Sequence, residues 1–154
     1  MGRPNYSHLF AILDQTLQNF IQEVNNQQLQ NMVTDEWSVN DELCHIVFWH
    51  RYYAQHYSAL AKGEKPFVFT SKGGSTRNKD GVDSLKTISK DELMRLLHMA
   101  QRELYESIVV KNVSAMNYTD RRRYTTEQFL DIVIGHIKRH TKHIMKAKKL
   151  DRVS

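Results

Sequence analysis

Apolar residues recur at three- and four-residue spacing over four long stretches of this chain, which is the spacing of one buried helix face. In the first stretch they are Leu9, Ile12, Leu13, Leu17, Phe20, Ile21 and Val24. The same pattern predicts helices over residues 7–30, 38–62, 89–111 and 125–149. Each of the last three helices begins with a capping box, in which a hydroxyl side chain pairs with an acid or amide three residues on. The pairs are Ser38–Asp41, Ser89–Glu92 and Thr125–Gln128.

Strand patterns are nearly absent, apart from a short extended piece over residues 65–70. Four long helices in 154 residues predict an all-α fold, a four-helix bundle that forms a single domain over residues 1–154. The connection over residues 63–88 is long, because loops in compact domains rarely exceed about 12–15 residues. We expect this crossover loop to form a lid over one end of the bundle, with a floppy connection as the alternative.

The composition is that of an ordinary globular chain, with 40% hydrophobic and 25% charged residues and a net charge of +5. The chain has one cysteine, Cys44, which excludes an intrachain disulfide and favours a reducing, cytoplasmic location. No signal peptide and no membrane span are predicted. Basic residues lie at 121–123 and 146–149, and we interpret them as solvated surface rather than as a nucleic-acid interface.

Three histidines fall in the middle of the apolar stripe of the last predicted helix. At about 100° per residue, His136, His140 and His143 share the face of Phe129 and Ala147. A buried imidazole without a partner costs about 1–3 kcal/mol, so these rings need partners. His136 and His140 lie one turn apart and can point at one ion.

The helix predicted over 38–62 offers a third ligand. One stripe of it is polar and aromatic, next to a plain apolar core stripe, and its members are Glu42, His45, Trp49, Tyr52, Tyr53 and His56. Three histidines from two helices, His45, His136 and His140, with positions left open for water or substrate, are typical of a catalytic metal site. Imidazole suits zinc, nickel, iron or copper. The alternative is a metal-free polar pocket, in which the histidines pair with Tyr, Glu or each other.

Two segments carry a resemblance to a known family. Residues 36–50 read EWSVNDELCHIVFWH and resemble the pattern W-S-x-x-D-x-L-x-H-x-x-x-W-H of the ClbS/DfsB family. Residues 124–130 and 135–143 are similar to the lead-in and body of that family's last helix. The family belongs to the DinB-like superfamily of four-helix bundles. Many members of that superfamily bind a metal through residues that correspond to His45, His136 and His140.

The resemblance also implies functions. ClbS-like proteins are associated with hydrolytic inactivation of an electrophilic cyclopropane genotoxin, whereas other DinB-like proteins resemble thiol-dependent transferases. The superfamily implies a homodimer and often has glutamine near the position of His143, which leaves the role of His143 open. A metal is not a defining feature of the ClbS branch.

We therefore expect a cytoplasmic small-molecule hydrolase with a detoxification or self-protection role and a histidine-lined pocket between the helices over 38–62 and 125–149. In that pocket His56 or Glu42 would relay a proton. Trp49, Tyr52 and Tyr53 would form a wall for a flat, unsaturated substrate, with His143 beside it. The alternatives are a DinB-like metal-dependent thiol transferase and a non-enzymatic small-molecule-binding protein. Cys44 is interpreted as an inert core residue.

Overall fold

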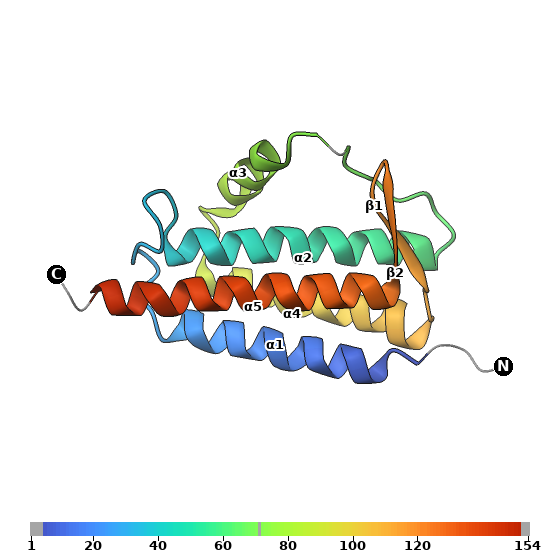
Figure 1. The fold of residues 1–154 in the computed structure, drawn as a ribbon, viewed down its shortest axis with the longest axis horizontal. Helices are drawn as coiled ribbons and strands as arrows, with labels where there is room; N and C mark the ends of the chain where they lie inside the picture. The colour runs from blue at the N-terminus through green and yellow to red at the C-terminus, as the bar shows by residue number, and fades with distance from the viewer. Residues whose placement is uncertain (1–4, 71, 152–154) are drawn as a thin grey trace.

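The structure, a computed structural model, describes residues 5–70 and 72–151, and it leaves out the side chains of residues 75 and 148–151. The fold is mostly α-helical, and four long helices lie side by side along the longest axis of the molecule (Figure 1). They are α1 (Ser7–Asn25), α2 (Val39–Ala61), α4 (Lys90–Tyr105) and α5 (Thr126–Asp151). Helix α2 packs against α4 and also contacts α5, and α1 packs against α5. These are the four helices that the apolar spacing predicts.

Two of the three predicted capping boxes are confirmed by reciprocal hydrogen bonds. At Ser89 only one of the two bonds forms, from Glu92 N to Ser89 Oγ, and the Glu92 carboxylate pairs with Arg95 instead. Asp41 N donates to Ser38 Oγ at 3.1 Å, and Ser38 N donates back to Asp41 Oδ2 at 3.0 Å. Thr125 and Gln128 form the same reciprocal pair at the start of α5. Each reciprocal box satisfies two backbone donors that a helix N-terminus leaves unpaired.

Two predicted helix ends are wrong. Helix α1 ends at Asn25 rather than at residue 30, because the backbone of residues 29 and 31 pairs with the start of α2 instead. Leu29 O accepts from Asn40 N, and Asn31 O accepts from Val39 N, both at 2.9 Å. Helix α4 ends at Tyr105, and its last predicted turn is the π-helical segment η1 (Glu106–Val110).

The structure also contains a small sheet, so the all-α prediction is wrong in this respect. Strands β1 (Ala115–Thr119) and β2 (Arg122–Thr125) form an antiparallel hairpin at the start of α5 (Figure 1). Met116 lies opposite Tyr124 and is buried. The rings of Tyr118 and Tyr124 contact each other with centroids 5.1 Å apart, and this packing anchors a strand pair too short to be stable alone.

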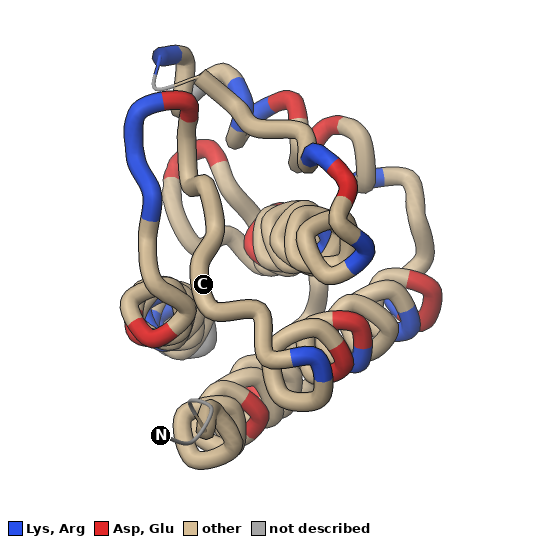
Figure 2. The backbone as a smooth tube through the Cα atoms, turned by 90° about the vertical axis from the view of Figure 1, so that its right-hand side faces the viewer, with Lys and Arg blue, Asp and Glu red and all other residues tan. Residues whose placement is uncertain are grey.

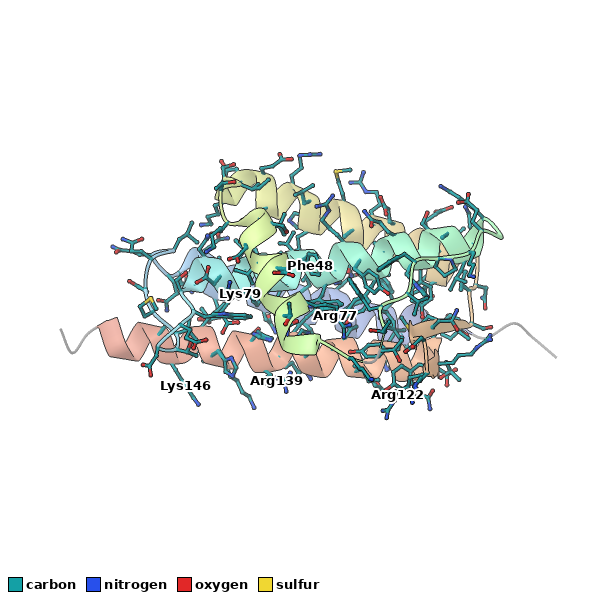
Figure 3. All side chains as sticks on the ribbon, turned by 90° about the horizontal axis from the view of Figure 1, so that it is seen from above. Phe48, Arg77, Lys79, Arg122, Arg139 and Lys146 are labelled. Carbon is teal, nitrogen blue, oxygen red and sulfur yellow. The ribbon has the colours of Figure 1, made fainter. Side chains whose placement is uncertain are left out.

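The segment over residues 63–88 is not an unstructured crossover, because it contains a further helix, α3 (Gly74–Leu85). Helix α3 packs on the flank of α2, where Val82 and Leu85 are buried. Gly81 permits this approach, since a Cβ at that position would lie 2.7 Å from the ring of Phe48. Seen from above, α3 crosses over α2 and α5 (Figure 3). It therefore forms a folded wall on one side of the long helices.

The core between the long helices is mostly apolar. Large side chains such as Phe10, Phe20, Leu43, Leu97 and Phe129 are fully buried. Several polar side chains on α2 and α5 are buried with them, namely Glu42, His45, His50, His56, Thr126 and His140. Buried polar groups are costly unless they are hydrogen-bonded, so their partners define where the chemistry of this protein lies.

Candidate metal centre

Three imidazoles from two helices converge on one point. His45 comes from α2, and His136 and His140 come from successive turns of α5. His136 Nε2 lies 3.1 Å from His45 Nε2 and 3.1 Å from His140 Nε2. The three ligand atoms all lie within 4.8 Å of one another. The structure thus brings together the three histidines that the sequence proposes as metal ligands.

The three Nε2 atoms cannot all satisfy one another with hydrogen bonds. His140 Nδ1 donates its proton to the carboxylate of Glu42, so a ring that holds a single proton presents a lone pair at Nε2. If His136 Nε2 is protonated, it shares one proton between two acceptors. If it is not, it faces the lone pair of His140. One of the two contacts therefore lacks a full hydrogen bond.

This donor set fits a divalent transition metal. Two imidazole nitrogens that bind one tetrahedral zinc at about 2.0–2.1 Å lie about 3.3 Å apart. The observed separations of 3.1 Å between Nε2 atoms are close to that value. Neutral imidazole is a ligand for zinc, nickel and iron alike, so the donor set does not select among them.

Burial keeps these rings in the form that binds metals. Burial, followed by the charges of His140, His136 and Arg139, lowers the pKa of His45 to about 3. Burial, followed by the charges of His140 and Arg139, lowers the pKa of His136 to about 3. Both rings are therefore neutral near pH 7, and their lone pairs remain available to a cation.

A buried carboxylate lies behind the histidines. Glu42 is 1% exposed, and its Oε2 accepts a hydrogen bond from His140 Nδ1. Its Oε1 accepts from His143 Nδ1 at 3.2 Å. A carboxylate on the outer nitrogen of a ligating histidine fixes the tautomer and the direction of the ring. Glu42, His140 and His143 also form a second group of possible metal ligands.

The histidine group forms part of the wall of a cavity of about 860 Å³. Aromatic rings make up much of the remaining wall, and they are Trp37, Trp49, Tyr52, Tyr53, Phe69 and Tyr118. The predicted wall residues Trp49, Tyr52 and Tyr53 line this cavity, and so does His143. The sequence interpretation missed Trp37, Phe69 and Tyr118, because loops and the β1–β2 hairpin bring them there.

Charged and amide side chains complete the lining. Arg77 and Asn78 come from α3, and Asp131 and Arg139 come from α5. Asn78 Oδ1 accepts a hydrogen bond from Trp49 Nε1 at 2.9 Å, which ties α3 to the aromatic wall. The segment that contains Arg77 and Asn78 is polar and rich in glycine, and it has no strong helical pattern. The sequence therefore did not place these two residues at the site.

His56 does not join the histidine group. It lies about three turns of α2 beyond His45, and Asn117 N donates to its Nε2 at 3.1 Å. Its Nδ1 lies 3.5 Å from Phe67 O. The ring thus links α2 to the β1–β2 hairpin and is absent from the cavity lining. Cys44 is buried, and burial raises the pKa of its thiol to about 11, as expected for an inert core cysteine.

A second cavity of about 830 Å³ adjoins the first. Four residues line both cavities, and they are Trp37, Asn78, His140 and His143. The second cavity also reaches Glu42 and several exposed charged side chains of α3. The histidine group is therefore bordered by two spaces rather than one.

Basic and acidic residues are scattered among uncharged residues over the described chain (Figure 2). The run Arg121–Arg123 follows β1 and continues into β2, and the side chains of Lys148 and Lys149 lie outside the described residues. Among the helices that the structure describes, none is long and apolar enough to cross a membrane. No protein-family model, curated protein or solved structure matches the chain.

Proposed function

We propose that this protein is a small-molecule hydrolase of the ClbS/DfsB kind, which inactivates a reactive electrophile in a detoxification or self-protection role. The proposal includes a DinB-like bundle formed by α1, α2, α4 and α5, and a cytoplasmic location. One observation carries it: His136 Nε2 lies 3.1 Å from both His45 Nε2 and His140 Nε2 on the wall of an aromatic cavity. Enzymes that activate water need such a group of donors beside a space for the substrate.

His45, His136 and His140 are the residues that would hold a metal, with zinc, nickel or iron as the ions that suit imidazole. When bound, a divalent ion would supply Lewis acidity and lower the pKa of a coordinated water toward neutrality. Glu42 holds the His140 ring in the orientation that this role requires. Both carboxylate oxygens of Glu42 already accept hydrogen bonds from imidazoles, so its role is positioning rather than proton relay.

The reaction adds water to a strained or polarised carbon. The water oxygen forms a bond to that carbon, the strained carbon–carbon bond breaks, and the carbon that leaves takes up a proton. The product is heavier than the substrate by one water molecule. The rings of Trp49, Tyr52 and Tyr53 would hold a flat substrate against the histidine group and exclude bulk water.

The second cavity favours one alternative, a metal-dependent thiol transferase. A cosubstrate in that cavity would reach the histidine group from the other side, through His140 and His143. The thiol sulfur would then bond to the electrophilic carbon, and the thiol proton would go to the leaving carbon. Cys44 cannot supply the sulfur, because it is buried in the core. The thiol must therefore be a separate small molecule.

The test begins with the metal content of protein purified without chelators, for the wild type and His140→Ala. About one ion per chain in the wild type, and none in the variant, supports the site. The matched control is His98→Ala, which removes an exposed histidine on α4 and should leave the metal content unchanged. No metal in the wild type, even after incubation with zinc, nickel and iron, would contradict the metal-dependent function.

Activity is tested by mass spectrometry on a cyclopropane electrophile, with and without an added thiol. A product heavier by one water identifies the hydrolase, and a thiol adduct identifies the transferase. Binding without conversion identifies a sequestering protein instead. Size-exclusion chromatography tests the homodimer that the DinB-like resemblance implies.

A further inference from the structure

We propose that the natural substrate is a planar, unsaturated molecule with an acidic group, and that Arg139 and Arg77 bind that group. That this molecule is a substrate rests on the proposed function. Its binding requires neither a metal nor catalytic turnover. It follows from the charge and the aromatic surface of the larger cavity.

The aromatic surface favours a flat partner. Six aromatic rings line the cavity, and several of them contact one another edge-on. The rings of Trp49 and Tyr52 lie 5.6 Å apart at 87°, and those of Tyr52 and Phe69 lie 4.8 Å apart at 41°. Rings held at such angles offer both faces and edges to a planar guest. A saturated, puckered guest would contact fewer of these surfaces.

The charges in the lining favour an anion. Arg77 from α3 and Arg139 from α5 line the cavity (Figure 3), and Asp131 is the one carboxylate among its described lining residues. The arginines and the carboxylate of the lining therefore sum to one net positive charge. Arg139 is an exposed side chain, and its charge is close enough to influence His45 and His136. An anion beside Arg139 would thus lie near the histidine group.

The guanidinium of Arg77 is held in place on the cavity wall. Its Nη1 donates to the carbonyl oxygens of Thr70 at 2.7 Å and Lys72 at 2.8 Å. Its guanidinium lies over the ring of Phe69, 4.8 Å from the centroid. The Nε atom is buried and has no hydrogen-bond partner among the described residues. Since Nε is closed off from the cavity, a ligand anion would meet this guanidinium through its positive charge and its outer nitrogens.

Asn78 adds a neutral donor to the same wall. Its Oδ1 already accepts from Trp49 Nε1, so its amide nitrogen is the group left to face a ligand. A guanidinium nitrogen, an amide nitrogen and a second guanidinium all donate, and none of them accepts. These three donors match the oxygens of a carboxylate.

The experiment measures binding to metal-free protein at neutral pH by isothermal titration calorimetry. Three probes of similar size separate charge from shape: cinnamate, its neutral amide cinnamamide, and the saturated acid cyclohexylpropanoate. We expect cinnamate to bind about tenfold more tightly than either of the others, the effect of one charge-assisted hydrogen bond or one lost stacking surface. The titration is done in the presence of a chelator and measures binding alone. Its result therefore does not depend on whether the histidines bind a metal or whether the protein is an enzyme.

Variants assign the preference to the two arginines. Arg139→Gln and Arg77→Gln should each bring cinnamate toward the affinity of cinnamamide while leaving cinnamamide binding unchanged. Arg102→Gln is the matched control, because Arg102 is exposed on α4, which contributes no residue to the described lining. Since Arg77 also holds the chain before α3, Arg139→Gln is the decisive variant. Equal binding of acid and amide, binding of neither, or a preference that survives Arg139→Gln would overturn the proposal.

Discussion

The buried carboxylate of Glu42 accepts a hydrogen bond from His140 Nδ1, while the opposite nitrogen of the same ring faces His136 at 3.1 Å. One side chain of α2 thereby sets the direction of a histidine on α5. A carboxylate in this position orients the ring and increases its basicity as a ligand. The affinity of this group for a metal would therefore depend on a residue that does not itself bind the metal.

The first prediction concerns Glu42→Gln. The substitution keeps the size of the side chain and removes its charge, so we expect zinc affinity to fall about 10- to 100-fold. A competition titration with a chromophoric chelator measures this change. Glu36→Gln, at an exposed position beside the second cavity, should bind zinc as the wild type does. Unchanged affinity in Glu42→Gln would show that the carboxylate does not support the ligand.

The second prediction concerns stabilisation by the metal. An ion that binds only the folded chain raises the free energy of unfolding by about 2.7 kcal/mol at 100 times its Kd. For a domain of this size the melting temperature should then rise by several degrees, and a chelator should reverse the rise. His136→Ala should abolish the effect, as monitored by circular dichroism. A full rise in that variant would place the ion elsewhere.

The third prediction concerns His50, which lies outside the metal site. Its ring is 1% exposed, and Nε2 donates to Gln101 Oε1 at 2.7 Å. Burial lowers its pKa to about 4, against which the hydrogen bond to Gln101 and the charge of Asp14 act. Near pH 5 the unfolded chain therefore binds a proton on this ring and the folded chain does not.

The sign follows from that difference in bound protons. The contribution of His50 to stability is complete above about pH 6.5, declines as the pH falls, and stops changing below about pH 4. The loss amounts to at most about 3 kcal/mol. Urea unfolding of metal-free protein at several pH values measures the slope, which should be shallower for His50→Asn than for the wild type. The exposed residue His98, replaced by Asn, should leave the slope unchanged, and equal slopes for His50→Asn and the wild type would refute the assignment.

The fourth prediction compares two helical glycines. Alanine at Gly81 would place Cβ 2.7 Å from the Phe48 ring, so Gly81→Ala should destabilise the fold by about 1–3 kcal/mol and loosen α3. Gly135 has nothing within 4 Å of its virtual Cβ, so Gly135→Ala should stabilise α5 by up to about 1 kcal/mol. Thermal denaturation distinguishes the two. A stabilised Gly81→Ala protein would mean that α3 does not pack closely on α2.

The periodic segments of the sequence predicted the long helices and the histidine group because those features depend on local spacing. His136 and His140 lie one turn apart on a stripe with Phe129, and this spacing requires that they share a buried face. His45 lies on the polar stripe of α2, and the contact between α2 and α5 brings it to the same place. The alternative of a metal-free pocket predicted histidines paired with Glu or with each other, and the structure contains both kinds of contact. Glu42 was identified on that stripe, but only as a proton relay.

The features that the sequence missed depend on tertiary contacts. Val82 and Leu85 are the buried apolar side chains among the described residues of α3, and the helix also contains Gly81, so its apolar pattern is too sparse to indicate a helix. The β1–β2 hairpin has a run of arginines at its turn and in β2, so the short alternation of Met116 and Tyr118 in β1 is not matched by an apolar second strand. Arg77 and Phe69 reach the cavity only because α3 folds back over α2. For these residues, spacing along the chain carries no information about which side chains they meet.

Tryptophan fluorescence can report on the cavity. Trp37 and Trp49 are the two tryptophans of the chain, and both line the cavity. Trp37 packs against the His45 ring with centroids 5.0 Å apart, and Trp49 is hydrogen-bonded to Asn78. All of the indole emission of the protein therefore originates beside the histidine group. A quenching ion such as copper or nickel, or a ligand that displaces water from the aromatic wall, should change that emission, so unlabelled protein can be screened against compound libraries in a plate reader.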